Sequence, residues 1–150
     1  MSKATKDKVL STVLDIVLPQ QVPDAKVLLG DAALERFGLL LAALAILPDI
    51  VAYSEEHNTL FFIQAATGTG GIDDQRYLEL EHWSSAANCH IAFVSAFASR
   101  KAYAECMKGT ASNTHIWFAD APKHSAYLSN SVEDSTQILE ARIAARAATR

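Results

Sequence analysis

Residues 48–66, PDIVAYSEEHNTLFFIQAA, decide the fold of this 150-residue chain. They hold two short runs of apolar, β-branched and aromatic residues, 50–53 and 60–66, separated by a polar stretch. Two such runs on either side of a polar connection predict a β-hairpin. In an antiparallel hairpin of these lengths, Asp49 before the first strand and Gln64 within the second are expected to lie side by side on one face.

The rest of the chain alternates between helical and strand patterns, which is typical of an α/β protein. Residues 1–24 predict an amphipathic helical lead that ends at Pro19 and Pro23 and packs on the rest of the chain. The remaining elements are expected as helices at 31–46, 73–83, 100–108 and 134–150, and strands at 26–29, 89–97, 115–119 and 126–128. The predicted architecture is a single α/β sandwich with a mixed β-sheet flanked by helices.

Composition excludes several classes of protein. With 50% apolar residues, 13 Lys plus Arg and 17 Asp plus Glu, the chain predicts one soluble globular domain rather than a disordered one. Two cysteines cannot form a disulfide framework, and the polar N-terminus is unlike a signal peptide, so we expect a reducing, cytoplasmic location. The longest apolar run, residues 37–47, spans about half a bilayer and predicts a buried helix, with no membrane partner. The net charge of −4 means that any DNA binding must use a local basic face.

Asp49 and Gln64 are the first candidates for chemistry. A carboxylate and an amide oxygen placed side by side suit Mg²⁺, which prefers hard oxygen donors and keeps most of its waters. A water made more acidic by the metal could attack a phosphodiester while the ion stabilises charge on the phosphoryl oxygens. On spacing alone, Asp49 also fits a turn residue after Pro48, and Gln64 fits an ordinary hydrogen-bonding side chain. Both interpretations stay open at this point.

Two groups of basic residues are candidates for contacting phosphate. Arg100 and Lys101 follow the predicted strand 89–97 and open a helix, near the carboxyl end of the sheet where α/β folds place their sites. A second group lies on one face of the helix predicted at 134–150, within the basic C-terminal segment 131–150. Its members are spaced by four and could track a phosphate backbone: Arg142, Arg146 and Arg150. Either group could instead form a solvated helix face.

Four blocks of sequence, taken in order, resemble the C-terminal catalytic domain of the BsuBI/PstI restriction endonucleases. The similarity begins near residues 25–31, AKVLLGD, and runs to about residue 130, which is roughly two thirds of the chain. No single block is specific, whereas the ordered set is. The blocks are 47–51 (LPDIV), 60–67 (LFFIQAAT), 93–97 (FVSAF) with Arg100 and Lys101, and 116–122 (IWFADAP) with His124.

The resemblance implies a nuclease of the PD-(D/E)XK class over residues 25–130, with Mg²⁺-dependent cleavage of double-stranded DNA in restriction-modification. On this pattern Asp49 corresponds to the motif's aspartate, and Gln64 stands where the family has a glutamate. The amide removes one negative charge from the metal site but still offers an oxygen to a hard cation, so weaker metal binding is expected. Ala66 stands at the motif's lysine position, and Lys101, with Arg100, is expected to supply the cation.

The resemblance also bears on partners. Cleavage of both DNA strands normally requires two sites, which favours a homodimer. The family's preceding helical domain, thought to help recognise the target, has no counterpart in residues 1–24, so specificity is expected to be lost or to come from a separate subunit. Two other hypotheses remain: a degenerate restriction fold that binds DNA or a partner protein without cutting, favoured by Gln64, and an unrelated α/β binding domain.

Overall fold

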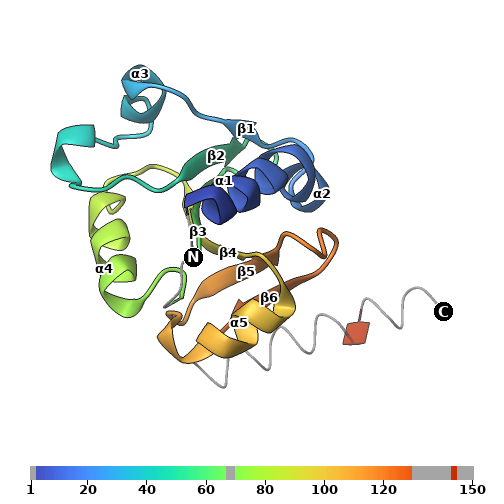
Figure 1. The fold of residues 1–150 in the computed structure, drawn as a ribbon. Helices are drawn as coiled ribbons and strands as arrows, with labels where there is room; N and C mark the ends of the chain where they lie inside the picture. Colours follow the sequence, from blue (N-terminus) through green and yellow to red (C-terminus); the bar gives the residue numbers. More distant parts are fainter. Residues whose placement is uncertain (1–2, 67–69, 130–142, 145–150) are drawn as a thin grey trace.

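The hairpin predicted from residues 48–66 is present and lies inside a mixed sheet (Figure 1). The computed structural model describes residues 3–66, 70–129 and 143–144. Strands β1 and β6 are antiparallel to their neighbours, whereas β4 pairs in parallel with both β3 and β5. The sheet follows chain order through β1 (Lys26–Val27), β2 (Ile50–Ser54), β3 (Thr59–Ala65), β4 (His90–Phe97), β5 (Thr114–Phe118) and β6 (Ser125–Leu128).

Helices cover both faces of the sheet, so the predicted α/β sandwich is confirmed. One face packs against α1 (Lys3–Thr12), a π-helical turn (Val13–Val17) and α2 (Leu18–Gln21), through buried valines that contact alternate residues of β2, β3 and β4. The opposite face of the central strands packs against α3 (Asp31–Glu35), α4 (Asp74–Trp83) and α5 (Arg100–Cys106). This division reflects the two-residue period of strands, which sends successive side chains to opposite faces.

The prediction of one helix over residues 31–46 is wrong. Helix α3 ends at Glu35, and the rest of this range holds a short 3-10 turn, Leu41–Ala43. Gly38 adopts a left-handed φ of 84°, and the Leu39 N–H donates to the Leu34 carbonyl across it, a geometry that terminates helices. The apolar run therefore divides, and Ile46 is 71% exposed rather than buried. None of the helices in the described ranges is long and apolar enough to cross a membrane.

The N-terminal lead is helical and packs on the sheet as predicted, but it does not end at Pro19. Proline has no N–H and its ring clashes with the carbonyl four residues earlier, here that of Asp15. The wider π-helical turn before it accommodates this, since the Leu18 N–H bonds to the Val13 carbonyl five residues back. The helix ends at Gln21, ahead of Pro23. Most of the predicted C-terminal helix lies outside the described residues.

Phe62 of β3 is fully buried and its ring contacts those of Trp83 and Phe93, with centroids 5.4 and 5.9 Å apart. Phe62→Ala is expected to lower the free energy of unfolding by about 3–5 kcal/mol, because it leaves a cavity between β3 and α4. Urea denaturation measures this change. Leu29→Ala, at a side chain 82% exposed, is the control and should cost less than about 0.5 kcal/mol. Equal losses in both variants would contradict this packing.

His115 of β5 predicts a pH dependence of stability. Burial lowers the pKa of His115, because the interior disfavours the charged imidazolium. The unfolded chain therefore binds this proton more readily, so stability is lost as the pH falls below the ordinary histidine value of about 6.5. Unfolding free energies of wild type between about pH 7.5 and 5.5 should fall more steeply than those of His115→Gln. Parallel curves would show that His115 does not contribute.

Candidate active site

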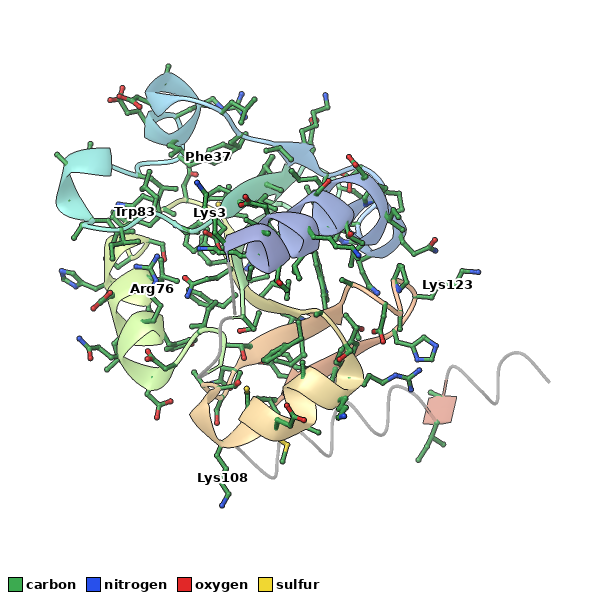
Figure 2. The ribbon with its side chains drawn as sticks, viewed as in Figure 1. Lys3, Phe37, Arg76, Trp83, Lys108 and Lys123 are labelled. Atoms are coloured by element: carbon green, nitrogen blue, oxygen red, sulfur yellow. The ribbon has the colours of Figure 1, made fainter. Side chains whose placement is uncertain are left out.

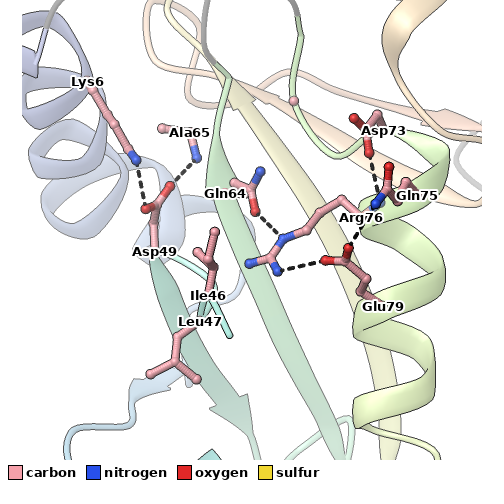
Figure 3. A pocket seen from close by; sticks show the side chains of 11 residues that line it. Lys6, Ile46, Leu47, Asp49, Gln64, Ala65, Asp73, Gln75, Arg76 and Glu79 are labelled. Carbon is pink, nitrogen blue, oxygen red and sulfur yellow. Dashed lines mark hydrogen bonds and ion pairs between the residues drawn. The ribbon is translucent and has the colours of Figure 1, made fainter. Parts of the chain in front are cut away.

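A cavity of about 320 Å³ lies where β2 begins and β3 ends, and residues of α1 and α4 form its walls (Figure 3). The charged and amide side chains that face one another there come from four segments that are distant in sequence. They are Lys6 of α1, Asp49 before β2, Gln64 of β3, and Asp73, Gln75, Arg76 and Glu79 at the N-cap and first turns of α4.

The register of the hairpin explains why Asp49 and Gln64 line one cavity. Ile50 lies opposite Ile63, so the next pair along the two chains is Asp49 with Gln64. Cross-strand neighbours on one face have their Cβ atoms close together. The Asp49 carboxylate is also fixed to the neighbouring backbone, since its Oδ2 accepts a hydrogen bond from the Ala65 N–H at 2.9 Å. The structure thus brings together the two residues that the sequence singled out.

Lys6 is a member of this site that the sequence analysis missed. Its Nζ lies 3.1 Å from Asp49 Oδ1, and the Asp49 side chain is only 17% exposed, so the ion pair is partly sheltered from water. Lys3 and Lys8 lie nearby in sequence, and composition does not distinguish Lys6 from them. Helical period does: Lys6 precedes buried Val9 by three residues and therefore shares the face that packs on the sheet.

Arg76 is the second missed cation. Its Nε donates to Gln64 Oε1 at 3.0 Å, and its Nη1 lies 3.5 Å from Glu79 Oε2. The side chain is 12% exposed, and within the described part of the chain its buried Nη2 has no hydrogen-bond partner. A buried donor without an acceptor is rare in folded proteins, which marks this guanidinium as unusual.

The start of α4 is anchored on the sheet beside Gln64. Ser95 is the partner of Gln64 in the β3–β4 register, and its Oγ accepts a hydrogen bond from the Ile72 N–H at 2.9 Å. A Cβ on Gly71 would overlap that Oγ, so glycine permits this close approach. Asp73 then caps the helix by accepting from the Arg76 N–H at 2.7 Å. The loop and cap together place Arg76 in the cavity.

The basic pair that the sequence analysis proposed after β4 lies outside this cavity. Arg100 and Lys101 are exposed in the first turn of α5, where Ser99 caps the helix by accepting from the Ala102 N–H at 3.1 Å. Neither is among the residues that line the cavity. The three arginines proposed to track DNA lie outside the described residues: Arg142, Arg146 and Arg150.

The oxygen donors of the cavity fit a hard cation by type, since Asp49 offers a carboxylate and Gln64 an amide oxygen. Lys6 and Arg76 already contact these oxygens, but each oxygen has a second lone pair that a cation can use. A different group, Asp24, Glu56 and His57, has ligand atoms within 4.8 Å of one another near the β2–β3 turn. Hydrogen bonds from Glu56 N–H and Ser54 Oγ lower the pKa of Asp24 there.

The mixed sheet and the helices on both of its faces define a restriction-endonuclease-like fold, and comparison with solved structures agrees. The structure of SdaI restriction endonuclease matches with a TM-score of 0.77 and 26% identity, over 87% of this chain and 44% of that one. The model of the BsuBI/PstI restriction endonuclease domain matches residues 4–131, and the chain therefore belongs to this family.

A curated relative places the chain in the same family. This chain is 26% identical over 128 residues to the type II restriction enzyme BsuBI of Bacillus subtilis. The match covers 78% of this chain and 40% of that enzyme. The chain thus spans less than half the length of both relatives. The family match begins at residue 4 and so includes α1 and Lys6, a wider region than the resemblance noted from residue 25.

Asp73→Ala should destabilise the part of α4 that carries Arg76. Loss of the N-cap bond is expected to cost about 1 kcal/mol of unfolding free energy, measured by chemical denaturation. Asp74→Ala is the matched control, because it removes a carboxylate from the same turn without removing the bond to the Arg76 N–H. If Asp74→Ala cost as much as Asp73→Ala, the effect would come from charge near the helix terminus rather than from the cap.

Proposed function

We propose that this chain is a Mg²⁺-dependent endonuclease domain that cleaves phosphodiester bonds of double-stranded DNA. The observation that carries the proposal is the pairing of Asp49 and Gln64 across the hairpin, in a cavity with two cationic side chains. Membership of the restriction endonuclease family supports the same reaction class. Carboxylate and amide oxygens would hold the metal, and nearby cations would attract a phosphate.

In this mechanism Mg²⁺, when bound by Asp49 and Gln64, would acidify a water and stabilise charge on the phosphoryl oxygens. Asp49 supplies the negative charge that attracts the ion, and the Ala65 N–H keeps its carboxylate oriented. Gln64 supplies a neutral oxygen that Arg76 holds in place. Lys6 balances the Asp49 charge in the free protein, which limits the cost of sheltering that carboxylate from water.

The contacts to DNA beyond this cavity remain predictions. The sequence analysis assigned the scissile phosphate to Lys101 or Arg100, but neither lines the cavity, so from α5 they would contact another phosphate of the duplex. The C-terminal arginines would follow the DNA backbone: Arg142, Arg146 and Arg150. Two copies of the chain would be needed to cut both strands, which favours a homodimer. A separate subunit that supplies sequence recognition, or the loss of that recognition, also remains a prediction.

A second candidate function is binding without cleavage. Gln64 favours it, because a neutral amide binds a divalent cation more weakly than a carboxylate does. The Arg76 Nε already bonds to the amide oxygen, and a metal ion would have to share or displace that bond. On this alternative the chain keeps the restriction endonuclease fold and binds DNA or a partner protein.

Plasmid cleavage separates the two functions. Wild type, Asp49→Ala and Gln64→Glu are incubated with supercoiled DNA in Mg²⁺ and in Mn²⁺, and nicked and linear products are measured. Asp49→Ala should lower the rate by at least about 100-fold, because it removes the charged ligand. Gln64→Glu should raise it, since a second carboxylate strengthens metal binding.

Asp15→Ala is the control, because it removes an exposed carboxylate of the π-helical turn that does not line the cavity. It should cleave as wild type does. If wild type and Gln64→Glu are both inert while their unfolding curves show an intact fold, cleavage by this chain alone is disproved. Binding without cleavage then becomes the better description.

A further inference from the structure

Arg76 has hydrogen-bond donors in the cavity that no described residue accepts from. A guanidinium carries five N–H groups in a rigid plane. Nε donates to Gln64 and Nη1 contacts Glu79, whereas Nη2 is buried without a partner among the described residues. A charged donor in this state is expected to be completed by an acceptor that the described residues do not supply.

The nearby carboxylates are directed at other donors, and none of those described is a hydrogen-bond partner of Nη2. Asp49 accepts from Lys6 and from the Ala65 N–H, and Asp73 accepts from the backbone N–H of Arg76. Glu79 contacts Nη1 at 3.5 Å, which is a long ion pair. The missing acceptor for Nη2 is therefore best supplied by a ligand, and arginine forms its strongest hydrogen bonds with carboxylate and phosphate oxygens.

We propose that Arg76 is the cationic catalytic residue of this site and that its Nη2 binds an oxygen of the scissile phosphate, a role that the sequence analysis gave to Arg100 and Lys101. The proposal rests on the DNA-cleaving function above. In this arrangement Arg76 touches both the predicted ligand Gln64 and the phosphate. Lys6 adds a second positive charge on the opposite wall of the cavity, beside Asp49.

The position of Arg76 favours it over the α5 cations. It lines the same cavity as Asp49 and Gln64, whereas Arg100 and Lys101 do not. The Asp73 cap and the Gln64 bond hold its side chain, so less conformational freedom is lost when a phosphate binds. Its planar fork can contact Gln64 and a phosphate oxygen at once in a fixed geometry, which the flexible ammonium group of a lysine does not provide.

Duplex binding without cleavage tests this assignment. Fluorescence anisotropy of a labelled duplex of about 20 base pairs is measured over a range of salt concentrations, with chelator and again with Ca²⁺ in place of Mg²⁺. Arg76→Gln should weaken binding roughly tenfold and reduce the salt slope by about one, as loss of one phosphate contact requires. Arg76→Lys should recover the slope but not the full affinity, because it keeps the charge and loses the fork.

Lys108→Gln is the matched control, since Lys108 is exposed and extends from the far end of the α5 region, away from Arg76 (Figure 2). It should bind as wild type does. Thermal unfolding checks the fold of each variant. Arg76→Gln should unfold close to wild type, because the lost contacts with Gln64 and Glu79 are offset by removal of a buried donor that lacks a partner among the described residues.

The assignment is overturned if Arg76→Gln binds duplex with the affinity and salt slope of wild type, or if Arg100→Gln or Lys101→Gln shows the predicted loss instead. Its failure is distinguishable from failure of the nuclease proposal. A chain that does not cleave, yet loses duplex binding on Arg76→Gln, disproves cleavage and keeps Arg76 as the phosphate contact. A chain that cleaves, and whose Arg76→Gln variant binds normally, disproves only the role of Arg76.

Discussion

The antiparallel register that sets Ile50 opposite Ile63 is the constraint on which the site depends. A slip of one residue would turn every side chain of β3 to the other face of the sheet. Phe62 would leave its contacts with Trp83 and Phe93, and Gln64 would point toward α1 rather than α4. The pairing of the hairpin therefore fixes the cavity as well as the core: the same register that buries Phe62 places Asp49 beside Gln64.

The wall of the cavity that α4 forms depends on how closely this helix approaches the sheet. Gly71 lies against Ser95, and the Ile72 backbone is held on both sides, by Ser95 Oγ and by the Ala111 N–H at 2.8 Å. The site thus has two kinds of support. Strand pairing sets the oxygen donors, and a tight loop with a capped helix sets the cation. A change at Ser95 would disturb both, because Ser95 also pairs with Gln64 in the β3–β4 register.

Much of this could be predicted from the sequence, because short runs rich in apolar, β-branched and aromatic residues, bounded by polar residues, indicate strands. The hairpin, the Asp49–Gln64 pair and the strands β4 to β6 are indicated by local pattern. The long helix over residues 31–46 was wrong because Leu-rich sequence suits a helix, whereas Gly38 and the hydrogen bond from Trp83 Nε1 to the Leu40 carbonyl impose a different path. Lys6 and Arg76 were missed for another reason. Each reaches the site through packing between segments far apart in sequence, and local spacing carries little information about such contacts.

The ion pair between Lys6 and Asp49 has a practical consequence for how this protein can be divided. The sequence blocks that resemble the family begin near residue 25, so a shortened protein could be designed to begin there. Such a fragment would lose α1, which forms one wall of the cavity. It would also lose Val9, Val13 and Val17, which bury one face of the sheet. The exposed apolar surface would promote aggregation, and Asp49 would be left without its counter-charge. The smallest unit that retains an intact site therefore begins before Lys6.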